Sequence, residues 1–294
     1  MMEARWLPNV SVVVPVRNSE HTLEQAIQSL LALEYPQDCL ELILVDNAST
    51  DGTSRILAAY SDHLRRLYEP KRGASAARNK GIAGARHPVI AFTDADCIVD
   101  RDWLKHLVAP LEDATVGISG GKIRAVRPCN PVQEYGEWIH DHEKAIRAYK
   151  PPYVITMNWA SRRSVLVEAG GFDEGLLRGE DVDLAYRIVQ AGYRLAYCAG
   201  AVVHHHNRSD LKELFREGFS HGFHSVKVLK KHRDFVRSLG HRRISVRSYK
   251  TLAANALRLA RNRADSEALF DTIFNTGKKA GKLLGSFRFA HVEL

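Results

Sequence analysis

The sequence predicts an α/β protein with a mostly parallel central sheet flanked by helices, and with a basic helical extension at its C-terminal end. Two observations predict this class. Short apolar runs, rich in β-branched residues, alternate with segments of helical periodicity through the first half of the chain. Polar residues follow these runs, as at the ligand-binding edge of a Rossmann-like nucleotide-binding sheet.

Strands and helices alternate in the first half of the chain. The runs VSVVVPV and ELILV are continuous and apolar, as in strands that are buried on both faces. Asp51 precedes Gly-Thr and a helical run, so it is expected to cap a helix. The expected strands lie at residues 10–16, 41–45, 64–68 and 88–93, and the expected helices at residues 23–35, 51–60 and 74–85.

The second half is less regular. We expect strands at residues 116–126 and 193–204 and helices at residues 131–149, 181–191 and 211–236. The last of these helices is basic and carries a stripe of Leu, Phe and Val along one face. Beyond Gly240 only a small helical tail is expected. We expect a main domain at residues 1–210, divided into halves at about residues 1–115 and 116–210. A basic, mainly helical extension is expected at residues 211–294.

Composition excludes several classes of protein. The chain has 294 residues, of which 45% are hydrophobic and 26% charged, as in a globular protein with a core. Its four cysteines are scattered without zinc or disulfide spacing, which favours a reducing, cytoplasmic compartment. Residues 1–9 lack the apolar core of a signal peptide, and no apolar run is long enough to span a membrane.

The positive charge is concentrated in one region. The net charge is +8, and Lys227 to Lys250 carries nine Lys or Arg against the single acid Asp234. No nucleic-acid motif accompanies this run, so no nucleic-acid partner is expected. The stripe on the basic helix either packs on the main domain or lies on an anionic inner membrane leaflet, which would make the protein a peripheral membrane protein.

Three polar pairs follow predicted strands and are expected to line one crevice. They are Arg17-Asn18, Asp46-Asn47 and Asp94-Asp96. Two carboxylates one residue apart after a buried strand suit Mn²⁺ or Mg²⁺, which would also bridge diphosphate oxygens. The alternative is a pair of solvated loop acids. The position of this D-x-D motif directly after PVIAFT favours the metal.

Four other features have a functional and a structural interpretation. Asp46 would either accept a hydrogen bond from an N–H group of a nucleotide base or stabilise a turn. Arg78 would either bind a diphosphate or be an exposed residue of a helix. The acids in Gly179-Glu180-Asp181-Val182-Asp183 complement a helix dipole, or one of them acts as a general base. In His204-His205-His206, one histidine binds metal, or all three are surface residues.

Taken together, these segments resemble glycosyltransferase family 2, which has the GT-A fold. Six segments match in the order of that family, and the resemblance covers about residues 10–225. They are SVVVPVRN (11–18), ELILVDNASTDGT (41–53), GASAARNKGIAGA (73–85), VIAFTDADCIVDRDWL (89–104), MNWASRRSVLVEAGGFDE (157–174) and GEDVDLAYRIVQAGYRL (179–195).

The resemblance implies roles for the matching positions. Asp181 would be the catalytic base, with Glu180 beside it, and Asp96 would bind the metal. The family often has a histidine three residues before an arginine in the segment after the last strand. His205 and Arg208 have this spacing, so His205 would be a further metal ligand, with His204 and His206 as alternatives. The positions implied to border the nucleotide or the sugar are Pro15, Val16, Arg17, Asp46, Arg78, Asp94, Ala95, Gly120, Asn158 and Trp159.

The expected activity is metal-dependent transfer of a sugar, with inversion, from a UDP- or GDP-sugar to an acceptor hydroxyl. The acceptor would be a glycan, a glycolipid or another glycoconjugate of the cell envelope. Two alternatives are a sugar-phosphate nucleotidyltransferase and a non-catalytic module that binds nucleotide-sugar or membrane. A nucleotidyltransferase needs a glycine-rich loop after the first strand, where this chain has PVRNSEHT. A non-catalytic module would be expected to lack Asp96 or Asp181, and both are present, so neither alternative is preferred.

Overall fold

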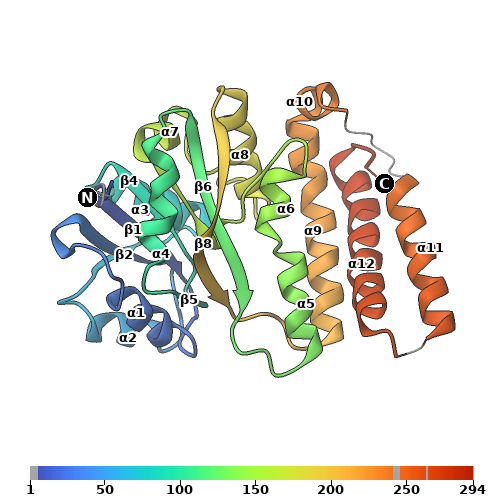
Figure 1. Ribbon diagram of the computed structural model, residues 1–294, viewed down its shortest axis with the longest axis horizontal. Coiled ribbons are helices and arrows are strands. Elements are labelled where there is room, and N and C mark those ends of the chain that lie inside the picture. The colour runs from blue at the N-terminus through green and yellow to red at the C-terminus, as the bar shows by residue number, and fades with distance from the viewer. Residues whose placement is uncertain (1–5, 241–245, 263, 294) are drawn as a thin grey trace, which may run out of the picture. The chain divides into compact units, whose positions relative to one another are not determined.

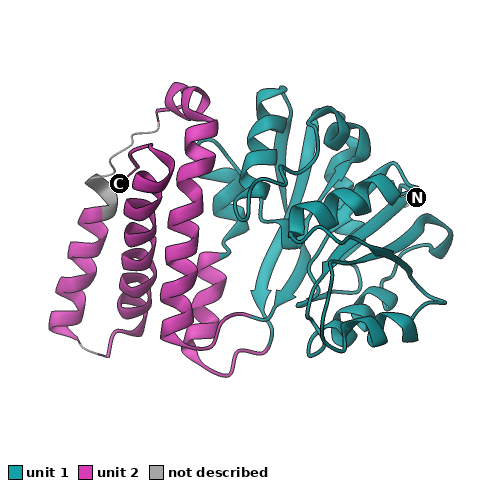
Figure 2. Cartoon of the chain, turned by 180° about the vertical axis from the view of Figure 1, so that it is seen from behind, with its two compact units in different colours: residues 1–126, 140–206 teal, residues 127–139, 207–294 magenta. Residues whose placement is uncertain are grey.

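The chain forms two compact units, which Figure 2 shows in different colours. The computed structural model describes residues 6–240, 246–262 and 264–293, so Arg242 and Arg243 of the basic run lie outside the described residues. The first unit comprises Met1–Val126 and His140–His206, and the second comprises Arg127–Ile139 and Asn207–Leu294.

The described part of the first unit contains an eight-stranded sheet, with strand order β3-β2-β1-β4-β7-β6-β8-β5 (Figure 1). Strands β1 to β4 pair in parallel with one another, as predicted for the first half of the chain. Strand β7 is antiparallel to β4 and β6, and β5 is antiparallel to β8. The strands are β1 Val10–Val16, β2 Leu40–Asp46, β3 Arg65–Tyr68, β4 Val89–Phe92, β5 Cys97–Val99, β6 Val116–Ala125, β7 Trp159–Arg162 and β8 Arg194–His205.

Helices cover both faces of the sheet, because its central strands are apolar on both sides. Val12 and Val14 of β1 face a core that contains residues of α1, α2 and α4. Val13 faces the other core, with residues of α3, α6, α7 and α8. The helices of this unit are α1 Leu23–Leu31, α2 Thr53–Ala59, α3 Ala74–Gly84, α4 Trp103–Val108, α6 His142–Arg147, α7 Arg163–Glu168 and α8 Glu180–Gln190, with short 3-10 turns at Gln37–Cys39, Ala109–Glu112 and Thr156–Asn158.

Several predicted elements are corrected by the structure. The helix predicted at residues 131–149 is two helices, α5 Pro131–Ile139 and α6. The break occurs because the Asp141 carboxylate accepts a hydrogen bond from the Lys144 amide, 2.9 Å away, and so starts a new helix. The first helix ends at Leu31 rather than at Tyr35. Strands β5 and β7 were not predicted, because they are only three and four residues long.

The second unit is a set of helices in which α9 and α12 pack against each other. The apolar stripe of α9 Leu211–Lys231 packs on α12 Ser266–Phe289: Leu214 shares a small core with Phe270 and Phe274. Glycines let the two backbones approach closely, since a Cβ on Gly285 would lie 2.7 Å from the Phe223 carbonyl oxygen. The helical character predicted for the C-terminal extension is confirmed, but the part beyond Gly240 is larger than the small tail expected, since it contains α11 Val246–Arg261 and α12. The predicted basic helix breaks at His232, before α10 Arg233–Ser238.

No helix within the described ranges has both the length and the apolar composition that crossing a bilayer requires.

Candidate functional site

Asp46 is held as a carboxylate at the end of β2. It accepts hydrogen bonds from the Ser54 hydroxyl at 2.7 Å and from the Ser49 amide at 3.1 Å. Arg66 lies 2.9 Å from its second oxygen. Burial alone would raise the pKa of Asp46, but these bonds and the Arg66 charge outweigh it and hold the pKa below its usual range. Sequence reasoning missed Arg66, whose only signal was its place on a neighbouring strand.

The polar ends of β1, β2 and β4 lie at one edge of the sheet, as predicted. Pro15 and Val16 pair in register with Val45 and Asp46. The Val16 side chain is buried and Arg17 is exposed beyond it. Asp51 was predicted to cap helix α2, but the N-cap residue is Gly52. Asp51 lies one residue earlier, and its carboxylate accepts a hydrogen bond from the Thr53 amide at 3.0 Å.

Asn47 fixes the loop that leads from β3 into α3. Its amide nitrogen donates to the carbonyls of Glu69 and Lys71, at 3.0 and 2.7 Å, and its oxygen accepts from the Gly73 amide at 2.8 Å. Gly73 has a φ of 135°, which a residue with a side chain rarely adopts. Helix α3 begins at the next residue, so Asn47 and Gly73 together set where Arg78 projects.

Arg78 connects the D-x-D motif to the start of α8. Its guanidinium is buried and lies 2.9 Å from the Asp94 carboxylate and 2.7 Å from that of Glu180. It also lies 5.5 Å from the centroid of the Phe172 ring, a contact that sequence reasoning missed. Burial would lower the pKa of Arg78, but Asp94 and Glu180 outweigh it and raise the pKa. The interpretation of Arg78 as an exposed helical residue is therefore wrong.

Asp96 and His205 face each other across β5 and β8. The His205 Nε2 atom lies 3.5 Å from an Asp96 carboxylate oxygen. Neighbouring side chains on a strand point in opposite directions, and His204 instead contacts Asp100 at 3.0 Å. The backbone amide of His206 donates to the Asp96 carbonyl at 3.1 Å. Of the three histidines, His205 is therefore the one placed beside the Asp96 carboxylate.

The Asp96–His205 pair offers one carboxylate oxygen, the ligand type that suits Mn²⁺ or Mg²⁺, and one imidazole nitrogen. Among the described residues, no group of three or more His, Cys, Asp or Glu side chains is arranged to hold a metal ion. A metal at this pair would thus need further oxygens from a ligand. A nucleotide diphosphate provides such oxygens, so the residues fit a metal that binds together with the donor.

Asp181 lies in the first turn of α8 and has an unusual pKa. Burial and the neighbouring charge of Glu180 raise the pKa of Asp181 from 3.8 to about 7, although hydrogen bonds from the Val182 and Thr156 amides and the charge of Arg78 oppose this rise. A carboxyl with this pKa exchanges a proton near neutral pH, as a general base must. The third acid, Asp183, is fully buried and pairs with Arg187 at 2.7 Å, so it stabilises the fold.

Three predicted sugar-site residues lie in the core and cannot contact a ligand through their side chains in this arrangement. The Asn158 amide is fully buried and bonds to the carbonyls of Lys122 and Ala201 and to the Trp103 indole. The Trp159 ring is fully buried against Phe92, with centroids 4.6 Å apart. Gly120 makes room for a neighbour, since a Cβ there would lie 2.7 Å from the His142 ring. These side chains therefore support the fold around them, and the place of these residues near the sugar stays a prediction. Ala95 is also buried.

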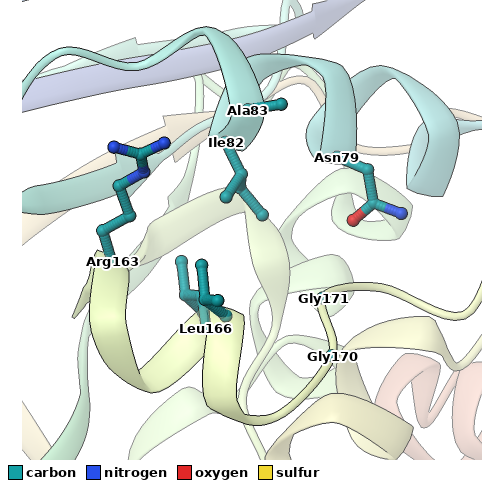
Figure 3. A pocket seen from close by; sticks show the side chains of 8 residues that line it. Asn79, Ile82, Ala83, Arg163, Leu166, Gly170 and Gly171 are labelled. Carbon is teal, nitrogen blue, oxygen red and sulfur yellow. The ribbon is translucent and has the colours of Figure 1, made fainter.

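A recess lies elsewhere in the first unit, between α3 and α7 (Figure 3). It has a volume of about 430 Å³ and is lined by Asn79, Ile82, Ala83, Arg163, Leu166, Val167, Gly170 and Gly171. None of the predicted site residues lines it. The Asn79 amide is bonded to both the amide and the carbonyl of Phe172, at 2.9 Å each. This recess is therefore not part of the site formed by Asp46, Arg78, Asp96 and Asp181.

The chain is similar in sequence to known glycosyltransferases. It matches Glycosyl transferase family 2 over residues 11–170, which is more than half of its length. It is 30% identical to Glycosyltransferase AglE of Haloferax volcanii over 76% of this chain and 74% of that protein. It is 32% identical to Pre-mycofactocin glycosyltransferase of Mycobacterium tuberculosis over 77% of this chain, but it spans only 48% of that protein.

Solved structures confirm the predicted GT-A fold. Mannosyltransferase PcManGT from Pyrobaculum calidifontis, in complex with GDP-Man and Mn²⁺, superposes with a TM-score of 0.71 at 23% identity, over 96% of this chain and 88% of that one. TarS 1-349 of S. aureus, in complex with UDP, superposes with a TM-score of 0.57 at 18% identity, over 96% of this chain and 92% of that one.

Proposed function

The chain belongs to glycosyl transferase family 2, and we propose that it moves a sugar from a nucleotide-diphosphate donor to an acceptor hydroxyl with inversion. The observation that carries this proposal is the link from Asp94 through buried Arg78 to Glu180, directly beside Asp181. It connects a diphosphate-binding edge to a carboxyl whose pKa is about 7. Membership of this family excludes the nucleotidyltransferase alternative.

The proposed reaction is one in-line displacement. Asp181 accepts the proton of the acceptor hydroxyl while that oxygen bonds to the anomeric carbon. The bond from the anomeric carbon to the diphosphate oxygen breaks on the opposite face, and the nucleotide diphosphate leaves with the electron pair. Asp46 would hold the base, and Arg78 would orient Asp94 toward the nucleotide. Because attack and departure occur on opposite faces, the anomeric configuration inverts.

We propose Asp96 and His205 as the metal ligands and Mn²⁺ or Mg²⁺ as the metal. The ion would supply positive charge that offsets the charge developing on the diphosphate. The Mn²⁺ in the PcManGT complex supports this proposal, as does the 3.5 Å approach of His205 to Asp96. The names of the relatives support a role in glycoconjugate synthesis at the cell envelope.

A panel of nucleotide-sugars tests the proposal. We expect the protein with Mn²⁺ to hydrolyse slowly at least one UDP- or GDP-sugar, because water replaces the missing acceptor, and to stop when the metal is chelated. Asp181→Asn should bind the same donor, measured by calorimetry, and lose hydrolysis. Hydrolysis that survives chelation would refute the metal ligands, and near-wild-type turnover of Asp181→Asn would refute the base.

We also propose that the second unit contacts an anionic membrane, through α11 and α12 rather than through the stripe of α9. Large apolar side chains are exposed on α12: Leu283 by 49%, Leu284 by 52% and Phe287 by 77%. From Thr276 to Ala290 the sequence has four Lys or Arg and no acid. Exposed apolar side chains beside cations are the composition that binds anionic lipid surfaces. A cytoplasmic, peripheral location is part of this proposal.

Vesicle sedimentation tests the membrane contact. We expect the protein to pellet with vesicles of phosphatidylcholine and phosphatidylglycerol, and much less with phosphatidylcholine alone. Phe287→Glu should reduce pelleting, because it places a negative charge on the apolar surface. Val167→Glu is the matched control, since Val167 is 62% exposed in the first unit. Equal losses in both variants, or pelleting that does not depend on phosphatidylglycerol, would refute the proposed surface.

A further inference from the structure

A second histidine packs against the proposed metal ligand His205. The imidazole rings of His140 and His205 have their centroids 5.2 Å apart and are nearly perpendicular, with an interplanar angle of 82°. In this arrangement the edge of one ring meets the face of the other, which is a favourable geometry for two aromatic rings. Both residues belong to the first unit, so the contact joins two distant segments of one compact body.

The structure around the start of α6 holds His140 in place. His140 is buried, with 7% of its surface exposed. The next residue, Asp141, caps α6 by accepting a hydrogen bond from the Lys144 amide at 2.9 Å. In the first turn of α6, the buried ring of His142 donates from Nδ1 to the Gly121 carbonyl oxygen of β6 at 2.9 Å. These bonds fix the start of α6 on the sheet, and His140 lies directly before it.

The backbone of His205 is fixed as well. His205 pairs in register with Cys97 of β5, and its carbonyl oxygen accepts a hydrogen bond from the Val126 amide at 3.0 Å. Its Nε2 atom lies 3.5 Å from a carboxylate oxygen of Asp96. With the backbone fixed, the orientation of the imidazole depends on rotation about its two side-chain torsions. The ring of His140 lies against the imidazole and limits this rotation.

We propose that His140 is a positioning residue of the metal site: its ring holds the His205 imidazole in the orientation that presents Nε2 to an ion beside Asp96. His140 does not act as a ligand itself, because no three His, Cys, Asp or Glu side chains in the described ranges form a metal-binding group. The inference rests on the proposed function. It adds a residue that lies outside all six segments that resemble the family.

The size of the effect follows from preorganisation. A metal ligand that is already oriented loses less conformational entropy when the ion binds. Removing a group that orients a metal-binding histidine typically weakens metal binding about tenfold or more. We therefore expect the Kd of Mn²⁺ to rise about tenfold in His140→Ala.

Mn²⁺ binding tests this role without the transfer reaction. Mn²⁺ is titrated by calorimetry into the protein saturated with UDP or GDP, whichever the wild-type protein binds, and the same titration without protein is subtracted. In a second measurement, electron spin echo spectroscopy of the bound Mn²⁺ detects the nitrogen of a coordinated imidazole. This nitrogen signal should be present in the wild-type protein, absent in His205→Ala and weakened in His140→Ala.

Three further variants separate the ring of His140 from other effects. His140→Phe keeps an aromatic ring, so its Kd for Mn²⁺ should stay within about twofold of the wild-type value. His140→Gln removes the ring with a smaller loss of buried volume, and it should repeat the effect of His140→Ala if that variant does not fold. His232→Ala is the matched control, because His232 is also 7% exposed but lies in the second unit, and its loss should leave the Kd unchanged.

Two results would overturn the proposal. One is a wild-type Kd and nitrogen signal in a folded variant without the ring, His140→Ala or His140→Gln. The other is an equal rise of the Kd in His140→Phe or in His232→Ala, because the ring at position 140 would then not be what matters. Failure of the proposed metal ligands would look different, since the wild-type protein itself would show no imidazole nitrogen on Mn²⁺.

Discussion

Replacing Asp181 by Asn should make the protein more stable while it abolishes transfer. The folded state raises the pKa of Asp181 from 3.8 to about 7, so it binds a proton that the unfolded chain has already released. The wild-type protein therefore loses stability as the pH rises from about 4 to about 7, which is the reverse of the usual behaviour of a paired carboxylate. An Asn side chain has no charge to bury, and its oxygen still accepts the hydrogen bonds from Val182 and Thr156.

The shift sets the size of the effect. Each pKa unit corresponds to about 1.4 kcal/mol, so a rise of about three units has an upper limit of about 4 kcal/mol. Asp181 retains partial contact with solvent, which screens its charge, and we expect a gain of about 2 kcal/mol at pH 8. More than half of this gain should develop between pH 5 and pH 8. Catalytic residues often carry such a cost in stability.

Urea denaturation at pH 5 and at pH 8, followed by the fluorescence of buried Trp103 and Trp159, measures the gain in stability of Asp181→Asn. Asp183→Asn is the matched control, two residues away. Its carboxylate is fully buried and lies 2.7 Å from Arg187, so its loss leaves an unpaired charge and should cost about 3 kcal/mol. The reasoning fails if Asp181→Asn is less stable than the wild-type protein at pH 8, or if its effect is the same at both pH values.

Three further predictions concern the metal, the pH profile and the second unit. His205→Ala should raise the Mn²⁺ concentration for half-maximal hydrolysis about tenfold, whereas His204→Ala should not; equal effects in a metal titration would contradict the ligand assignment. The rate of transfer should fall as the pH drops below about 7, where Asp181 is protonated. In a pH–rate profile, Glu180→Gln should move this fall to lower pH, because it removes a negative charge beside Asp181; an unmoved profile would count against an effect of Glu180 on the pKa of Asp181. Gly281→Val should lower the stability of the second unit by about 2 kcal/mol in thermal melting, because a Cβ there would collide with the backbone of α9, and an unchanged melting temperature would refute that contact.

Sequence patterns predicted much of the first unit because they are local. The runs at β1 and β2 are apolar except at Ser11, Glu41 and the terminal Asp46, and only a strand covered on both faces buries their consecutive apolar side chains. Polar residues directly after parallel strands must lie at one sheet edge, whatever the rest of the fold. The placement of Asp46 and of Asp94 at the same edge of the sheet followed from these two facts.

The three histidines show what local sequence patterns cannot predict. Alternation along a strand predicts that His204 and His205 point in opposite directions, but not which of them meets Asp96. The register of β8 with β5 decides this, because Cys97 pairs with His205. Register depends on contacts between segments more than 100 residues apart in the sequence. For the same reason, the motif MNWAS did not predict that the side chains of Asn158 and Trp159 are buried.

The sequence by itself determined the fold class, the sheet edge at which the polar residues gather and the residue types that could carry chemistry there. The tertiary structure alone decided the states of those residues: that Arg78 is buried between Asp94 and Glu180, that burial gives Asp181 a pKa of about 7, and that the stripe of α9 packs on α12. The physical reason is that periodicity and capping depend on neighbours along the chain. Burial and charge coupling depend on neighbours in space, which only the folded chain brings together.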